Sequence, residues 1–402
     1  MVAWDVAVSP LIRFGLVLLG GLASGELTRR AFNLPRTTGY VLFGVLVGQS
    51  GLGWVPPSAL SAAQLFIYPG IGIILFELGH RFPLGPGWGC LLRMALLQAA
   101  LVFTALGALL WGLGFDGLEA AFGAAIGVAT SSAITIATGS DVGADGPRSS
   151  RLFALVALNG MLAFCLLGFI LPLAATANLF RACAEAVLHL IVSVGLALLL
   201  STVARWGARL LGPQQEHQHL MLLGLIILGT GVPLSLGFSP LLCLVCFGIA
   251  ARVLDTEQHI CTLRIAADAR VFLVITFSLA GAALDVGLLG RLWPAALAFG
   301  AVRFAASWFA LGVAARRGWL ESDMVRPTAI GLMPMSSVAL VLLGDAATLE
   351  GAVGAPLGQL LLASIALFQL CGPPCTQAAV KGFGEARRYV SKKVFRELWR
   401  RA

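Results

Sequence analysis

Charged residues are scarce in this sequence, and their scarcity excludes most water-soluble folds. Asp, Glu, Lys and Arg make up 11% of the 402 residues, whereas a soluble domain carries about a quarter. So few charges cannot cover a water-facing surface, and 58% of the residues are hydrophobic. A hydrocarbon solvent removes the need for a charged surface, so the composition indicates a membrane protein. The 48 glycines agree with this interpretation, because small residues let helices approach closely within lipid.

The sequence also lacks a disulfide framework and the common catalytic motifs. Several of the cysteines lie in apolar runs, namely Cys165, Cys243, Cys246, Cys371 and Cys375. Cys243 and Cys246 form a CxxC inside an expected helix, without a second pair or nearby histidines, so we interpret them as small apolar residues. No HExxH, paired-aspartate motif or phosphate-binding glycine-lysine loop occurs. We therefore expect neither an enzyme nor a cofactor or metal site.

Apolar runs of about membrane-spanning length recur along the chain, which predicts an all-α polytopic membrane protein. The expected spans are residues 9–27, 37–50, 63–79, 88–113, 117–138, 150–176, 184–205, 217–231, 234–253, 268–285, 292–314, 326–343 and 353–378. A hydrocarbon core of about 30 Å needs about 20 apolar residues per helix, which gives about 13 transmembrane helices.

Positive charge is distributed unevenly between alternate loops. One set of loops holds Arg29, Arg30, Arg36, Arg81, Arg93, Arg148, Arg151, Arg205, Arg209, Arg252, Arg264, Arg270, Arg316, Arg317 and Arg326. The opposite set holds only Arg13, Arg181 and Arg291. We call the first set the arginine-rich side. By the positive-inside rule it faces the cytoplasm of a bacterial-type inner membrane, with the N-terminus outside. The net charge of +8 is then a topology signal, and we expect no nucleic-acid partner.

The basic tail, residues 381–402, belongs to the same side. It contains eight of the 27 Lys and Arg residues, so we expect a cytoplasmic C-terminus. The run ARRYVSKKVFRELWRRA predicts either an amphipathic helix on anionic lipid or a solvated basic stop after the last span.

Two short segments echo each other. Residues 129–133 read ATSSA and follow Gly127, and residues 335–339 read MSSVA and follow Gly331. The spans that contain them are the fifth and the twelfth, whose positions differ by an odd number, so they cross the membrane in opposite directions. Inverted repeats with helices interrupted near the midplane are frequent in secondary transporters.

Five segments, in order, carry a resemblance to a known family. They are TTGYVLFGVLVGQSGLGWV (37–55), GIGIILFELGHRF (70–82), AIGVATSSAITIATGSD (125–141), RVFLVITFSLAGAALDVGLL (270–289) and GLMPMSSVALVLL (331–343). Together they resemble the monovalent cation:proton antiporter superfamily, its Kef-like branch and the sodium:proton exchangers. The resemblance covers most of residues 10–375.

The resemblance implies a fold and an activity. It implies one transporter domain, residues 1–380, with core helices at about 88–176 and 292–378, and scaffold and dimer helices at about 9–79 and 184–285. It also implies inverted repeats, two broken and crossing helices, a homodimer in membrane lipid, and alternating access by core movement. The activity would be secondary active antiport of a monovalent cation, Na⁺ or K⁺, against protons.

The sequence departs from the family where the ion is held. The family carries an Asp-Asp or Asn-Asp pair in the sixth span, and here the pair reads Asn159-Gly160. An amide offers an oxygen to a cation or a nitrogen to an anion, but it does not titrate near neutral pH. The second broken helix reads Met335-Ser336-Ser337 where the family often has Arg-Gly-Glu.

The family's basic residue in the eleventh span is present as Arg303. An arginine at the centre of a span costs about 2.5–3.5 kcal/mol on insertion scales, so it needs a partner inside the protein or in water. The candidate partners are Glu77, Asp268, Asp285, the carbonyls at broken-helix ends, or a bound anion. Whether the role of Arg303 is functional or structural stays open.

Other polar residues complete the candidate site. Thr130, Ser131, Ser132, Ser336 and Ser337 are expected to line the ion- or substrate-binding site with Asn159 and Arg303, with Thr135 nearby. Each hydroxyl could instead bond to the carbonyl one turn back. Glu77 is the candidate proton carrier, although its neighbours His80 and Arg81 would also suit a solvated interface position.

We therefore expect cation:proton antiport. The alternatives are a transporter of the same fold for an anionic or sodium-coupled substrate, and a transport-inactive membrane scaffold or sensor that acts through its tail.

Overall fold

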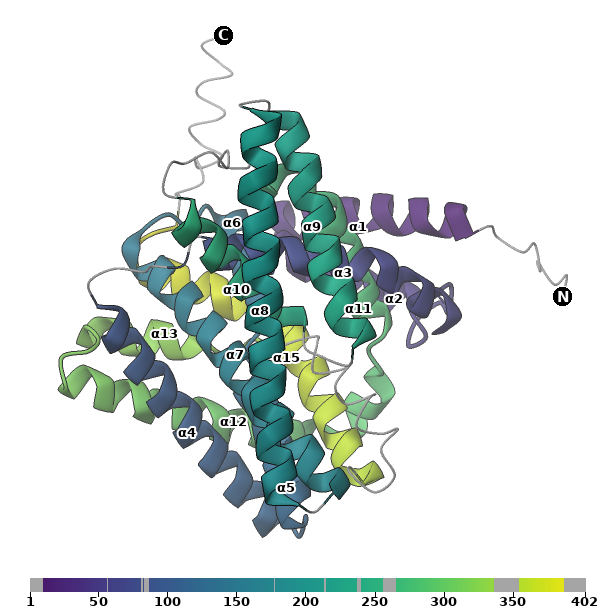
Figure 1. The fold of residues 1–402 in the computed structure, drawn as a ribbon. Coiled ribbons are helices and arrows are strands. Elements are labelled where there is room, and N and C mark those ends of the chain that lie inside the picture. The colour runs from purple at the N-terminus through teal and green to yellow at the C-terminus, as the bar shows by residue number, and fades with distance from the viewer. Residues whose placement is uncertain are drawn as a thin grey trace, which may run out of the picture.

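A computed structural model describes residues 10–55, 57–80, 82, 87–176, 178–212, 215–236, 240–255, 265–335 and 354–386. All regular elements in these ranges are helices (Figure 1). They are α1 (Pro10–Phe32), α2 (Arg36–Val47), α3 (Pro57–His80), α4 (Trp88–Gly112), α5 (Gly117–Val128), α6 (Ser132–Val142), α7 (Pro147–Thr176), α8 (Leu179–Leu211), α9 (Gln215–Ser235), α10 (Pro240–Leu254), α11 (Ile265–Ala282), α12 (Val286–Arg316), the short 3₁₀-helix η1 (Ser322–Met324), α13 (Val325–Gly331) and α15 (Ala355–Gly382).

The expected all-α fold is confirmed, and two expected spans differ in detail. The run 117–138 forms two helices, α5 and α6, instead of one. Of the run 326–343, α13 ends at Gly331 and residues 336–343 lie outside the described ranges. Among the described residues, six helices are long and apolar enough to cross a membrane, namely α4, α7, α8, α9, α12 and α15. The count of about 13 spans stays a prediction.

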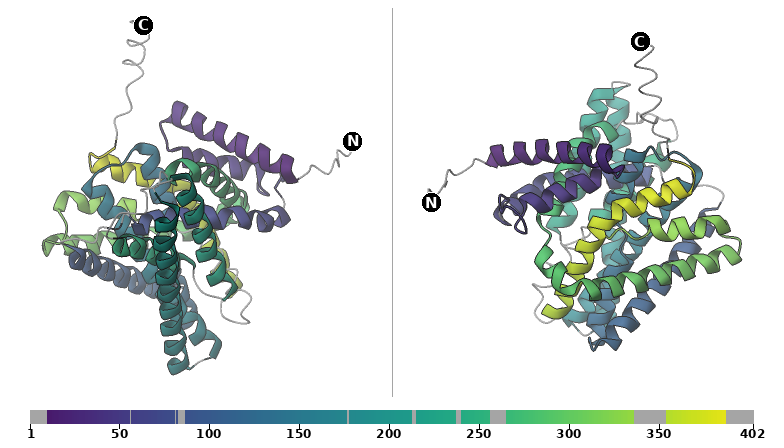
Figure 2. Two further views of the ribbon diagram at one scale, coloured as in Figure 1. Left: turned by 45° about the horizontal axis from the view of Figure 1, so that its top comes forward. Right: turned by 180° about the vertical axis from the view of Figure 1, so that it is seen from behind.

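The helices pack in two groups (Figures 1 and 2). The broken-helix group consists of α4, α5, α6, α7, α12, α13 and α15, in which α4 packs on α5, α7 and α12, and α15 packs on α12, α13 and α6. The flanking group consists of α1, α2, α3, α8, α9, α10 and α11. The two groups meet where α8 packs on α7. The expected division into a moving core and a fixed scaffold stays a prediction.

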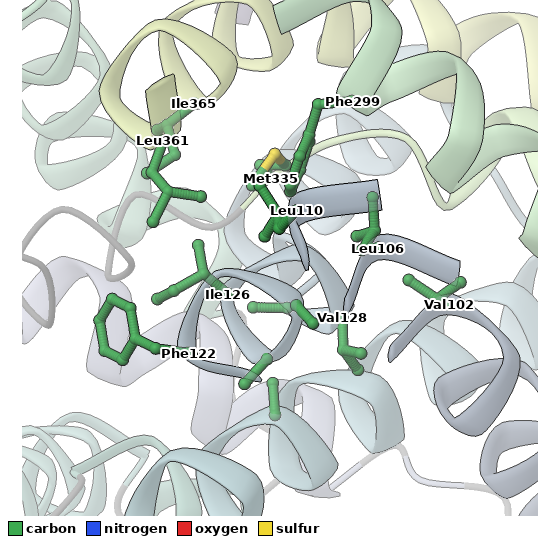
Figure 3. Close-up of a cluster of buried hydrophobic side chains, with 14 of the residues drawn as sticks. Val102, Leu106, Leu110, Phe122, Ile126, Val128, Phe299, Met335, Leu361 and Ile365 are labelled. Atoms are coloured by element: carbon green, nitrogen blue, oxygen red, sulfur yellow. The ribbon is translucent and has the colours of Figure 1, made fainter. Parts of the chain in front are cut away.

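A buried apolar cluster surrounds the end of α5 and holds the broken-helix group together (Figure 3). Its side chains come from α4, α5, α7, α12, α15 and the segment after α13, and include Val102, Leu106, Leu110, Phe122, Ile126, Val128, Phe299, Met335, Leu361 and Ile365. Because the fold buries these side chains on every side of α5, the position where α5 ends is fixed by packing.

Glycines allow backbone contact within the flanking group. A Cβ atom at Gly44 of α2 would lie 1.9 Å from the carbonyl oxygen of Ser278 on α11, and one at Gly79 of α3 would lie 2.1 Å from that of Val245 on α10. No other residue fits at such distances, which explains part of the high glycine content.

Segments of the arginine-rich side contact one another in space. Arg148 forms ion pairs with Glu321 and Asp323, and Arg252 donates to the carbonyl oxygen of Phe82 at 2.7 Å. These contacts between distant segments are consistent with the prediction that the loops of the arginine-rich side lie on one face of the molecule.

The same side carries polar contacts between the two groups. Arg36, at the start of α2, donates its backbone N–H to Oδ2 and its guanidinium Nη1 to Oδ1 of Asp141 on α6, at 2.5 and 2.7 Å. The hydroxyls of Thr37 and Thr138 lie 3.1 Å apart. Any displacement of one group along the other has to break these bonds.

Candidate functional site

The first broken helix is interrupted at residues 129–131. α5 ends at Val128, Ala129 and Ser131 have extended backbone conformations, and α6 begins at Ser132. The Ser131 hydroxyl accepts a hydrogen bond from the backbone N–H of Ile134 at 3.2 Å and so caps α6. The interruption expected in this run is therefore confirmed.

The segment that follows α13 pairs with this interruption. Thr130 and Met335 form an antiparallel β-bridge, and the backbone N–H of Ser131 donates to the carbonyl oxygen of Pro334 at 2.9 Å. We call the two paired stretches, residues 129–131 and 333–335, the crossing. Two helix ends thus meet inside the broken-helix group.

Arg303 of α12 binds both helix ends at the crossing. Its Nε donates to the carbonyl oxygen of Gly127 at 2.6 Å, and its Nη1 donates to that of Met333 at 2.5 Å. Its Nη2 donates to the carbonyl oxygen of Ala129 at 3.4 Å and to the hydroxyl of Thr130 at 3.3 Å. The side chain is 2% exposed, and its Cζ lies 5.9 Å from the centroid of the Phe368 ring.

These contacts identify the partner of Arg303 among the candidates. The last carbonyls of a helix lack partners within the helix and carry the negative end of its dipole. A guanidinium between two such ends satisfies the carbonyls and neutralises both dipoles. Asp285 instead caps the start of α12, accepting from the N–H of Leu288 at 2.9 Å. The side chain of Asp268 lies outside the described part of the chain.

Asn159 and Gly160 lie on α7 beside the crossing. Asn159 is fully buried, and within the described residues neither its amide nitrogen nor its amide oxygen has a hydrogen-bond partner. A Cβ atom at Gly160 would meet one neighbouring atom, the carbonyl oxygen of Thr130, at 4.0 Å. The position that carries an acidic residue in the family therefore faces the crossing and has room for a side chain. Leaving a buried amide unpaired is costly, so the role of Asn159 in binding an ion or substrate stays a prediction that its position beside the crossing permits.

Of the hydroxyl residues that the sequence predicts at the site, those of the first broken helix lie at or beside the crossing. Thr130, Ser131, Ser132 and Thr135 are all buried at the crossing or in the first turn of α6. The Thr135 hydroxyl donates to the carbonyl oxygen of Ser131 at 2.8 Å, which is the bond to the carbonyl one turn back that the sequence left open as an alternative. Ser336 and Ser337 lie outside the described residues.

Glu77 lies apart from the crossing, at a cavity between the two groups. The cavity has a volume of about 110 Å³ and is lined by Glu77 and Leu78 of α3 and by Ser140, Asp145 and Ser150 at the junction of α6 and α7, among others. Glu77 is partly exposed. It is thus a carboxylate at the boundary of the two groups, on the arginine-rich side.

Two residues of this region were missed by the sequence interpretation. Asp145 lines the cavity from a loop, and no sequence pattern distinguishes it from other loop carboxylates. Gln369 of α15 is 2% exposed, and neither polar atom of its amide has a partner in the described ranges. A glutamine in the middle of an apolar run was a signal that could have identified it.

Comparisons with known proteins agree with this architecture. Residues 14–380 match the model of the family described as sodium/hydrogen exchanger, transmembrane. The fold is similar to two structures of the sodium proton antiporter MjNhaP1 from Methanocaldococcus jannaschii. The structure at pH 8 has a TM-score of 0.64 and 18% identity, covering 92% of this chain and 95% of that chain. The electron-microscopy structure has a TM-score of 0.72 and 17% identity, covering 94% and 98%. No curated protein matches the chain in sequence. Because the family model covers most of the sequence, the chain belongs to the transmembrane sodium/hydrogen exchanger family.

Proposed function

We propose that this protein is a secondary active transporter that exchanges a monovalent cation, Na⁺ or K⁺, for protons across a bacterial-type inner membrane. Family membership supports the reaction class. The observation that carries the proposal is the fully buried amide of Asn159, which has no partner within the described residues and lies beside the interruption between α5 and α6. Secondary transporters bind their ions at this kind of midplane interruption.

The polar groups near Asn159 favour a cation over an anion. Its amide oxygen and the Thr130 carbonyl oxygen that faces Gly160 are oxygen ligands of the type that alkali cations accept, and the buried hydroxyls of Ser131 and Ser132 lie at the start of α6. The donors of Arg303 point at four protein oxygens. Arg303 therefore has few donors left for an anionic substrate and acts as a clamp on the two helix ends.

Protons need a carrier other than the crossing itself. Within the described residues no carboxylate contacts Asn159 or Arg303, and an amide cannot release a proton near neutral pH. Glu77 lies at the cavity between the groups, where a carboxylate can exchange protons with water. We assign the proton step on the arginine-rich side to Glu77.

Transport requires the two groups to move relative to each other. The broken-helix group would be the moving core and the flanking group the scaffold of a homodimer, with the N-terminus outside and the C-terminus in the cytoplasm. The bonds of Arg36 and Thr37 to Asp141 and Thr138 would then break and re-form in each cycle.

The uncharged pair Asn159-Gly160 supports one second candidate. A protein without a carboxylate at the crossing could bind an ion but not transport it, and act as a membrane scaffold or sensor through residues 381–402. Such a protein would give no cation-driven proton movement, which the following experiment measures.

The test uses the purified chain in liposomes that contain a pH-sensitive dye. Addition of Na⁺ or K⁺ outside should drive proton movement in the wild type, and Glu77→Gln should reduce the rate at least tenfold. Glu216→Gln, at an exposed position at the start of α9, is the matched control and should transport like the wild type. A wild type without cation-dependent proton movement would refute antiport, and an active Glu77→Gln variant would refute the role of Glu77.

A further inference from the structure

A row of polar side chains on α8 has no role in the function described so far. Arg181, Glu185, His189 and Ser193 follow one another at intervals of four residues, so each lies beside the next, and the row turns gradually around the helix from the exposed Arg181 to the buried Ser193. Arg181 Nε donates to Glu185 Oε1 at 3.1 Å, and the hydroxyl-bearing Ser193 is 2% exposed. We call these four residues the α8 row. It begins at the end of α8 away from the arginine-rich side and continues inward.

His189 is the innermost titratable residue of the row, and it faces the broken-helix group. α8 packs antiparallel against α7. A Cβ atom at Gly168 of α7 would lie 3.7 Å from His189 Nδ1, so the imidazole lies against α7 where that helix has no side chain. Gly168 is eight residues from Gly160, about 12 Å along the helix at 1.5 Å per residue. His189 thus lies on the boundary between the groups, on the far side of the crossing from Glu77.

Few other groups at this boundary can exchange protons. The remaining titratable residues on the helices packed against α8 are Cys165 on α7, Cys243 and Cys246 on α10, and, towards the arginine-rich side, Arg148, Arg151, Arg252, Glu216, His217 and His219. Ionisable side chains inside membrane helices are expensive and mark ion or proton pathways. Imidazole is the side chain that both accepts and releases a proton near neutral pH.

We propose that His189 is a proton-transfer residue for the side opposite Glu77, with Glu185 and Arg181 as its outer partners. This inference rests on the proposed antiport. When the core faces that side, a ring nitrogen of His189 accepts a proton from water at the α8 row and releases a proton to water between α7 and α8, or the reverse. No other bond changes, so the imidazole returns to its starting state after each transfer. The chain would then carry one proton-transfer residue on each side of a crossing that Arg303 clamps.

The test separates proton coupling from ion movement. In proteoliposomes, ²²Na⁺ uptake is measured once with a pH gradient and once as Na⁺/Na⁺ exchange at equal pH. His189→Gln should reduce gradient-driven uptake at least tenfold and remove its pH dependence between about pH 5.5 and 7.5, while exchange stays within about twofold of the wild type. His189→Glu should restore coupling with the pH profile moved to lower pH, because a carboxyl has a lower pKa than imidazole.

His217→Gln, at an exposed position on α9, is the matched control and should keep the wild-type pH profile. Unchanged coupling and pH profile in His189→Gln would overturn the inference. Loss of exchange together with coupling would also overturn it, because the role of His189 would then be structural. A wild type that exchanges Na⁺ but shows no gradient-driven uptake would instead refute the proposed antiport.

Discussion

At the residue scale, Arg303 is a structural clamp as well as a charge. It satisfies carbonyl oxygens at the ends of two helices from within a buried position. Because each hydrogen bond to a charged group contributes about 1.5–3 kcal/mol, replacing this side chain should strongly destabilise the crossing.

We predict that Arg303→Met lowers the thermal unfolding midpoint of the purified protein, with a loss of about 3–5 kcal/mol. The carbonyl oxygens of Gly127 and Met333 would remain buried without donors. Arg303→Lys should recover part of the loss, since an ammonium keeps the charge but not the planar fork. The control is Arg291→Met, at an exposed position near the start of the same helix. Equal midpoints for Arg303→Met and Arg291→Met would contradict the clamp.

Gly160 allows a gain-of-function test at the same scale. Gly160→Asp would create the Asn-Asp pair of the family, with a Cβ about 4.0 Å from the Thr130 carbonyl oxygen. A carboxylate there should attract a cation, and a gain of about 1.4 kcal/mol would lower the half-saturating Na⁺ concentration about tenfold. Gly160→Asn should fold equally well without this gain. If Gly160→Asp and Gly160→Asn show the same half-saturating concentration in ²²Na⁺ uptake, the ion does not bind at this position.

At the element scale, the start of α7 is capped by a residue that is distant in sequence. The Glu385 carboxylate, just after α15, accepts from the backbone N–H groups of Arg148 and Ser149 at 3.0 and 2.6 Å. A Cβ atom at Gly146 would lie 2.2 Å from the Glu385 carboxyl carbon, so a side chain at this position would displace the carboxylate from the cap. A carboxylate at a helix N-terminus also interacts favourably with the helix dipole.

This cap makes stability depend on pH. Burial tends to raise the pKa of Glu385, but the hydrogen bonds from Ser149 and Arg148 outweigh it and hold the pKa below the ordinary value of 4.5. A carboxyl with a lowered folded-state pKa stabilises the fold above its unfolded-state pKa, and that stabilisation is lost as pH falls through the folded-state value.

We therefore predict that Glu385→Gln lowers stability by about 1 kcal/mol at pH 7. The difference from the wild type should shrink as the pH falls below 4.5. Thermal unfolding in detergent at a series of pH values measures it. A difference that stays constant as the pH falls well below 4.5 would show that Glu385 acts through packing and not through its charge.

At the scale of the whole molecule, the helices and their order could be predicted from the sequence, because apolar length is a local property. The interruption between α5 and α6 followed from the Ser-Ser echo and the family resemblance. The sequence named the carbonyls at broken-helix ends only as one of several possible partners of Arg303. Its acceptors are backbone carbonyls of Gly127 and Met333, which become available only when both helix ends are fixed in space.

The contacts between the broken-helix group and the flanking group could not be predicted from the sequence either, because they also depend on how the helices pack in space. Arg36 and Asp141 are far apart in the chain, and each resembles any other loop-end charge until α2 and α6 pack together. The neutral pair Asn159-Gly160 was visible in the sequence. That it faces the crossing and leaves a buried amide unpartnered in the described residues emerged only from the packing of α7.

The central claim is that the crossing beside Asn159 binds the transported cation. It is tested most directly by ²²Na⁺ uptake into proteoliposomes under a pH gradient, comparing the wild type with Asn159→Ala and Asn178→Ala. Asn178 caps the start of α8 at an exposed position and serves as the matched control. The account predicts uptake in the wild type and in Asn178→Ala, and a rate at least tenfold lower in a folded Asn159→Ala variant. Wild-type uptake in Asn159→Ala would contradict it.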